Sequence, residues 1–416
     1  MTSHGHGVAR ATRPRTQEQR QIDLDKIAHY RTLEDEVREK AKQKDYGPST
    51  FQLTSKLLRL NPEYYTVWNI RRRCVTSGFS SGPWDGSPPS KASSSSLPTA
   101  TPLASSDAPL PSSSAVTPQS RDSPTAGKSG TTADVAGEGR GKQTSRSTWE
   151  ADLEVLKSEL LFTVPLLMDF PKCYWIWNYR LWALNLAIER LVVPVACKVW
   201  EQELGLVGKM LNKDRRNFHA WGYRRYVVDR LESSELSGRS LVEPEFEYTT
   251  KMIHVDLSNF SAWHYRSRLI PRMLREREAS DDSRKQFLES ELGLIREGLN
   301  VGPEDQSLWF YHQFLIYNIV DTPGPQTIAP ALTDDERKFY VQQEIDEVND
   351  LLEDYKNIKW IYEALFQYTL ALSRLGEPVE KSAISNNLTA WLHKLRELDP
   401  QRSGRWTDLE SHLNMV

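Results

Sequence analysis

The stretch from Arg215 to Arg225 reads RRNFHAWGYRR and concentrates side chains that could carry out chemistry. Four arginines, one histidine and three aromatic rings stand within these eleven residues. Guanidinium groups bind phosphates and carboxylates, and aromatic rings stack on bases or on the guanidinium groups themselves. The composition is typical of a nucleic-acid surface or a catalytic pocket, but it also suits the inner face of a repeated helix.

The charge balance of the whole chain argues against nucleic acid. Its 416 residues carry 53 Lys and Arg against 56 Asp and Glu, a formal net charge of −3, so no global attraction to a polyanion or an anionic membrane is expected. No apolar run is long enough to span a bilayer, and the N-terminus has no apolar leader. These features predict a cytoplasmic protein that is not a membrane protein.

The residues that could bind metals or act as nucleophiles do not form a recognisable set. Cys74, Cys173 and Cys197 are too few and too scattered for a disulfide framework or a zinc cluster. The sequence also lacks a phosphate-binding P-loop and a Ser-His-Asp arrangement. We therefore expect no cofactor or metal to be bound by this chain alone.

A repeat explains the opening stretch. Aligned on Trp221, four other segments fall into register, and an aromatic residue three before and an arginine three after the tryptophan recur in most of them. By residue number the last four tryptophans are 44, 42 and 46 residues apart, whereas the first two are 109 apart. The five tryptophans are Trp68, Trp177, Trp221, Trp263 and Trp309.

The long interval contains a Ser- and Pro-rich segment, residues 81–147, whose removal restores the period. It has too few large apolar residues to offset the entropy of ordering, so it is predicted to be a disordered insertion in a loop of the first repeat. Thr101, Thr117 and Ser123 each precede a proline and could be kinase acceptors, although an inert tether is the simpler interpretation.

Amphipathic stretches between the motifs predict that each repeat is a helix, a short turn and a second helix that carries the motif. Pro171 and Pro303 suit the first turn of the second helix, and Asp214 and Asp256 suit its N-cap. The predicted fold class is all-α, a right-handed α-α superhelix, that is, a solenoid of stacked helical hairpins.

On the second helix, the aromatic residue, the tryptophan and the arginine fall on one stripe. We expect this stripe to be structural, with the tryptophan buried between hairpins and the arginine lying against rings while it bonds carbonyls at a neighbouring turn. The predicted structural repeat residues are Trp68, Arg71, Trp177, Arg180, Trp221, Arg224, Trp263, Arg266 and Trp309.

The remaining chain is assigned from the same patterns. Predicted helices cover 17–42 ahead of the repeats and 334–355, 357–375 and 380–398 after them. The predicted organisation is a flexible tail at 1–16, a leading helix and first repeat at 17–80, the insertion at 81–147, repeats two to five at 148–320 and closing helices at 321–416.

The repeated pattern resembles that of the protein prenyltransferase alpha-subunit family, whose motif is Asn/Asp-x-x-Asn-Tyr/Phe-x-x-Trp-x-x-Arg. NFHAWGYRR, NFSAWHYRSRLIP and DQSLWFYH are most similar to the Rab geranylgeranyltransferase (type II) branch, in the compact form found in fungi. The resemblance implies a beta-subunit partner that holds the zinc and the prenyl pocket. It also implies Rab GTPases presented by an escort protein, with geranylgeranyl diphosphate as donor.

The resemblance also implies site residues. Lys172 and Tyr174 match the lysine and tyrosine that the family places near the diphosphate, and His219 is a further candidate facing the shared active site. Lys172 would begin a helix, where the dipole also favours an anion. His4 or His6 could reach the zinc of the beta subunit.

Two alternatives remain open. The chain could be the alpha subunit shared by farnesyltransferase and type I geranylgeranyltransferase, which act on CaaX proteins. It could also be a helical-repeat scaffold without a catalytic part.

Overall fold

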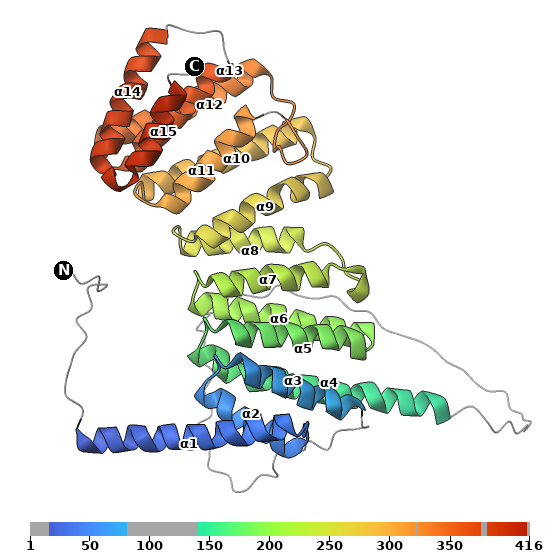
Figure 1. Cartoon of the computed structure of the whole chain (residues 1–416). Helices are drawn as coiled ribbons and strands as arrows, with labels where there is room; N and C mark the ends of the chain where they lie inside the picture. The colour runs from blue at the N-terminus through green and yellow to red at the C-terminus, as the bar shows by residue number, and fades with distance from the viewer. Residues whose placement is uncertain (1–15, 81–139, 322, 376–380, 414–416) are drawn as a thin grey trace, which may run out of the picture. The chain divides into compact units, whose positions relative to one another are not determined.

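The computed structural model describes residues 16–80, 140–321, 323–375 and 381–413. These residues form α-helices and two short 3-10 helices, and no strand occurs among them, which confirms the predicted all-α class (Figure 1). The chain divides into two compact units, Met1–Phe162 and Thr163–Val416. The candidate histidines His4 and His6 and the three kinase acceptors lie outside the described residues.

The first unit contains α1 (Gln17–Lys42), α2 (Pro48–Leu60), α3 (Tyr65–Ser80) and the first part of α4 (Arg140–Asp169). α1 has the predicted bounds and begins at a capping box formed by Thr16 and Gln19. α4 begins at Arg140, seven residues before the predicted end of the insertion at residue 147. Residues 81–139 of the predicted insertion lie outside the described part of the chain.

The second unit is a series of helical hairpins. Each first helix packs against the second helix that follows it. Second helices also contact one another: α5 contacts α7, and α9 and α13 both pack against α11. The hairpins are α6 (Val193–Lys213) with α7 (Phe218–Leu231), α8 (Val242–Val255) with α9 (Phe260–Glu276), α10 (Asp281–Val301) with α11 (Gln306–Val320), and α12 (Asp334–Asp354) with α13 (Lys359–Leu375); α5 (Tyr174–Arg190) contacts α6 and α7.

The second helices begin later than the sequence predicts. Asn217 caps α7 and Asn259 caps α9, each through a side-chain oxygen that accepts backbone N–H groups of the first turn. Asp214 and Asp256, the predicted N-caps, instead end α6 and α8 as C-caps. Only two residues separate the two kinds of cap, and both Asp and Asn suit an N-cap, so composition alone did not select between them.

The predicted positions of Pro171 and Pro303 are wrong for the same reason. Both prolines lie in the turn between helices rather than in the first helical turn, since α5 begins at Tyr174 and α11 at Gln306. Their carbonyl oxygens accept hydrogen bonds from the tryptophans of their own repeats. The prolines therefore shape the turn on which each motif closes.

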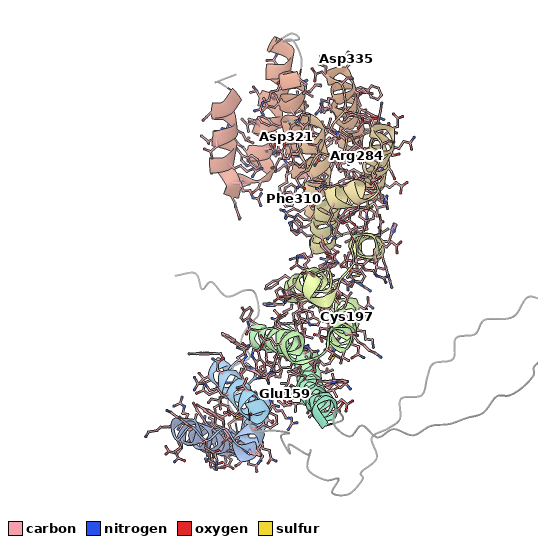
Figure 2. All side chains as sticks on the ribbon, turned by 90° about the vertical axis from the view of Figure 1, so that its right-hand side faces the viewer. Glu159, Cys197, Arg284, Phe310, Asp321 and Asp335 are labelled. Atoms are coloured by element: carbon pink, nitrogen blue, oxygen red, sulfur yellow. The ribbon has the colours of Figure 1, made fainter. Side chains whose placement is uncertain are left out.

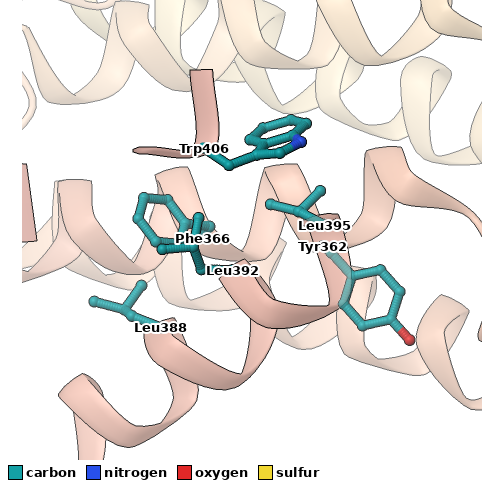
Figure 3. Close-up of a cluster of buried hydrophobic side chains, with 6 residues drawn as sticks. All are labelled: Tyr362, Phe366, Leu388, Leu392, Leu395 and Trp406. Carbon is teal, nitrogen blue, oxygen red and sulfur yellow. The ribbon is translucent and has the colours of Figure 1, made fainter. Parts of the chain in front are cut away.

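The C-terminal end of the second unit adds α14 (Lys381–Leu398) and α15 (Ser403–Leu413). α12, α13 and α14 lie close to their predicted ranges, whereas α15 was not predicted. Trp406 of α15 is fully buried in a cluster with Tyr362 and Phe366 of α13 and with leucines of α14 (Figure 3). This cluster covers the apolar face that the last hairpin would otherwise expose.

Candidate functional site

Each motif tryptophan closes the turn that precedes its own helix. Trp221 is fully buried, and its indole N–H donates to the carbonyl of Arg215 at 2.7 Å. Burying the indole in this way removes a large apolar area from water while its one donor stays satisfied. The same bond joins Trp68 to Pro62, Trp177 to Pro171, Trp263 to Leu257 and Trp309 to Pro303.

The motif asparagine links one repeat to the next. Asn217 accepts two backbone N–H groups of α7 at 3.1 and 3.2 Å, and its amide N–H donates at 3.0 Å to the carbonyl of Pro171 in the preceding repeat. Asn259 donates in the same way to the carbonyl of Arg215, also at 3.0 Å. Each of these carbonyls thus binds the tryptophan of its own repeat and the asparagine of the next.

The motif arginine pairs with a buried glutamate of the next hairpin. Arg224 donates through Nε and Nη2 to the two carboxylate oxygens of Glu245 at 2.8 and 2.6 Å, and its Cζ lies 3.5 Å from the Tyr248 ring centroid. Such bidentate pairs fix both partners in position. The equivalent pairs are Arg71 with Glu159 (labelled in Figure 2), Arg180 with Glu203, and Arg266 with Glu291.

The sequence interpretation foresaw the rings but assigned carbonyls as the main acceptors of these arginines, which was wrong. Their principal acceptors are glutamates that are at most 3% exposed. A signal was present, because a glutamate stands inside the apolar stripe of each first helix, as in KSELLF, EQELGL and ESELGL. A charge on a buried face needs a buried partner of opposite sign, and the motif arginine was available.

A tyrosine strengthens two of these pairs. Tyr223, two residues after the motif tryptophan, donates its hydroxyl to Glu203 at 2.5 Å, and Tyr311 donates to Glu291 at 2.5 Å. Burial raises the pKa of Tyr223 well above its usual value, and the neighbouring Glu203 raises it further. The carboxylate therefore joins the arginine of one repeat to the tyrosine of the next.

The fifth repeat departs from the pattern at its arginine position. His312 stands there, with Nε2 at 2.9 Å from a carboxylate oxygen of Glu344 and Nδ1 at 3.1 Å from the Tyr368 hydroxyl. Arg296 of α10 also donates to Glu344. Burial disfavours the Glu344 carboxylate, but the hydrogen bond from His312 and the charge of Arg296 leave its pKa below the usual value.

The aromatic residues three before the tryptophan do not join the buried stripe, contrary to prediction. Each is the first residue of its helix, so it projects beyond the packed turns. Three of them, Tyr174, Phe218 and Phe260, begin α5, α7 and α9 of the second unit and are 53%, 67% and 49% exposed. These three rings, with the neighbouring His219, are called the aromatic edge below.

Lys172 lies beside the aromatic edge, in the turn before α5. It does not begin a helix as predicted, since α5 starts two residues later at Tyr174. Its side chain is 71% exposed, and Nζ stands 3.9 Å from a carboxylate oxygen of Asp214. The hydrogen bond from Asn217 to the Pro171 carbonyl holds this turn against the start of α7. The backbone of this turn is thus held beside the edge, while the exposed ammonium group of Lys172 is open to an anion.

The structure brings the other two candidates together. The rings of Tyr174 and His219 have centroids 6.3 Å apart, and the His219 ring also packs against Phe218 at 4.0 Å. A phenol, an imidazole and a nearby ammonium can together donate hydrogen bonds and positive charge to an anionic group. Within the described residues, no group of three or more His, Cys, Asp or Glu side chains could hold a metal ion.

A comparison with family models identifies the class of protein. The protein prenyltransferase alpha subunit repeat matches residues 49–78, 156–187, 200–231 and 242–273. The fold is similar to a chain in the structure of Candida albicans protein geranylgeranyltransferase-I complexed with GGPP, with a TM-score of 0.53, 18% identity and coverage of 93% of this chain and 91% of that one.

Curated relatives define the branch. The chain is 30% identical to the Saccharomyces cerevisiae geranylgeranyl transferase type-2 subunit alpha, covering 98% of this chain and 99% of the relative. It is also 30% identical to the Schizosaccharomyces pombe subunit of the same name, with 98% of each chain covered. The chain therefore belongs to the family of type-2 geranylgeranyltransferase alpha subunits, within the prenyltransferases. No helix in the described part of the chain is long and apolar enough to cross a membrane.

Proposed function

We propose that this chain is the alpha subunit of a heterodimeric Rab geranylgeranyltransferase of the cytoplasm. It would act only with a beta subunit and transfer geranylgeranyl from geranylgeranyl diphosphate to C-terminal cysteines of Rab GTPases presented by an escort protein. The observation that carries this proposal is the 30% identity, along nearly the whole chain, to type-2 alpha subunits of two fungi.

The aromatic edge supports a partner chain at the starts of α5, α7 and α9. Tyr174, Phe218 and Phe260 expose large apolar rings that the fold of the second unit does not need, since the tryptophan and arginine of each repeat already fill its interior. Neighbouring exposed aromatic side chains are typical of interfaces, where they supply much of the binding energy. We assign this edge to the beta subunit.

In the proposed reaction the acceptor sulfur forms a bond to C1 of the prenyl group, and the C1–O bond breaks with its electron pair leaving on diphosphate. The partner subunit is expected to supply zinc, which when bound favours the thiolate form of the acceptor cysteine. The ammonium group of Lys172 would stabilise the negative charge that develops on the leaving diphosphate in the transition state. Tyr174 and His219 would donate hydrogen bonds to the same group.

The test is co-purification with each of two beta subunits, of the Rab-acting and the CaaX-acting type. Each complex is then offered a Rab–escort complex and a CaaX peptide with labelled geranylgeranyl diphosphate. We expect labelling of the Rab only, by the complex with the Rab-type partner. Labelling of the peptide alone would support the CaaX branch, and the absence of any stable beta partner would support a scaffold.

A further inference from the structure

Two arginines on neighbouring second helices lie close to each other, and neither has a counter-ion within the described residues. Five arginines in or next to α7 and α9 each form an ion pair with an Asp or Glu side chain: Arg216, Arg224, Arg266, Arg272 and Arg277. Arg225 of α7 and Arg268 of α9 form no ion pair or hydrogen bond with any residue that the structure describes. Their positive charges are therefore available to a group outside this chain.

These two arginines and His264 form one cluster, called the cationic cluster below. Arg225 lies over the ring of Tyr265 of α9, with its Cζ 5.8 Å from the centroid, so its side chain reaches across from α7 to α9. His264 and Arg268 are one turn apart on α9 and therefore lie on the same face of that helix. Gly222 lies one turn before Arg225, and a Cβ added at Gly222 would meet only an Arg225 nitrogen, at 4.0 Å.

The members of the cluster destabilise one another electrostatically. Burial lowers the pKa of Arg225, and the charge of Arg268 lowers it further. Burial likewise lowers the pKa of His264, and the charges of both arginines add to that effect. A half-buried guanidinium next to a second cation is unfavourable unless an anion compensates it. An incoming carboxylate or phosphate would relieve this repulsion.

The position of the cluster favours a protein carboxylate over the prenyl diphosphate. Arg225 lies six residues beyond His219 on α7, a rise of about 9 Å along a helix, so it is separated along α7 from the proposed diphosphate site at His219. The cluster is continuous with the aromatic edge, because the His264 ring stacks on Phe260 with centroids 5.9 Å apart. A partner that covers the edge would therefore extend over the cluster.

We propose that the cationic cluster of Arg225, His264 and Arg268 receives one or two Asp or Glu side chains of the beta subunit, forming an ion-pair contact at the heterodimer interface. The guanidinium fork matches a carboxylate in a bidentate geometry, which fixes the register of the partner as well as adding affinity. This inference rests on the proposed function, since it needs the beta subunit as partner.

The test compares the affinity of the full-length chain for purified beta subunit in two double variants. Arg225→Gln with Arg268→Gln removes both unpaired charges of the cluster. Arg239→Gln with Arg275→Gln removes two exposed arginines of the same unit that also have no ion pair within the described residues. We expect the first variant to weaken binding about 10- to 100-fold, mainly through faster dissociation, and to reduce the salt dependence of Kd. The control should stay within about twofold of the parent.

The readouts separate the possible failures. If the parent chain does not bind the beta subunit, or if their complex does not transfer the prenyl group, the proposed function itself is wrong. If the parent binds and both double variants match it, the ion-pair contact is wrong. Weaker binding of the Rab–escort complex with unchanged beta affinity would assign the cluster to the escort side and also overturn the proposal. Arg225→Lys with Arg268→Lys keeps the charge without the fork, so it should fall between the parent and the glutamine variant.

Discussion

The two sides of the second helices in the second unit differ in what repeats. On the buried side, tryptophan, arginine and the glutamate that follows them recur with nearly the same contacts, and only the fifth repeat substitutes a histidine for the arginine. On the exposed side the residue types change from repeat to repeat. The position of Lys172 is held by Arg216 in the next repeat, and the positions of His219 and Arg225 are held by serines in the repeat that follows theirs. The recurring residues hold the hairpins together, and we assign function to the residues that vary.

The largest expected effect is a loss of stability when an arginine on the buried side is replaced. Arg224→Ala leaves Glu245 as an uncompensated buried charge, so we expect a loss of about 3–5 kcal/mol in the apparent free energy of unfolding. Urea denaturation followed by circular dichroism measures it. The control is Arg216→Ala, which removes a pair whose arginine is 59% exposed and should cost at most about 1 kcal/mol. Equal losses in the two variants would contradict the structural role of the buried pair.

A smaller loss is expected from the asparagine that links two repeats. Asn217→Asp keeps the oxygen that caps α7 but removes the donor to the Pro171 carbonyl and places a carboxylate near it. We expect a loss of about 1–3 kcal/mol, as for a buried group whose hydrogen bond is removed. Asn217→Ala also removes the cap and should lose more. If the aspartate variant is as stable as the parent, the contact between repeats contributes nothing.

A substitution on the exposed side should weaken assembly with the beta subunit while leaving the stability of this chain unchanged. Phe218→Ala removes a ring that is 67% exposed in this chain, so its unfolding midpoint should hardly change. If the ring is an anchor for the beta subunit, Kd should rise tenfold or more, measured by calorimetry on the purified subunits. A lower unfolding midpoint with an unchanged Kd would place Phe218 with the structural residues instead.

The smallest expected effect comes from an exposed ion pair. Lys285 and the backbone of Thr333 hold the pKa of Glu336 down to about 2, from 4.5. Because the folded-state pKa is lowered, the stabilisation is present above pH 4.5 and is lost as the pH falls from 4.5 toward 2. Glu336→Gln should therefore differ slightly from the parent in urea midpoint at pH 7 and less at pH 3. A difference that grows on acidification would contradict this.

Much of the fold followed from the sequence because its signals are local and repeated. The tryptophan register and the amphipathic stretches predicted the hairpins, and α1 was placed with its observed bounds. The partners of the arginines were missed because Glu203 and Glu245 are more than 20 residues away in the sequence, in other helices. The exposure of Phe218 was missed because one position at a helix start decides whether a ring is covered by the preceding turn.

The site was predictable only in part. The resemblance pointed to Lys172, Tyr174 and His219, and the structure places the two rings 6.3 Å apart. It could not reveal the cationic cluster, because the absence of a counter-ion at Arg225 and Arg268 depends on which side chains of the surrounding helices reach them. The same residues would be unremarkable on a helix with a glutamate one turn away.

The measurement that tests the central claim most directly is the turnover number of the purified heterodimer with Lys172→Ala. We predict a fall of about one to two orders of magnitude in kcat with an unchanged affinity for the beta subunit, as expected for one lost charge-stabilising group. Lys251→Ala, on the exposed face of α8, is the matched control and should keep parental turnover. Lys172→Arg should retain part of the activity. An unchanged kcat in an intact Lys172→Ala complex would contradict the assignment of function to the residues that vary between repeats.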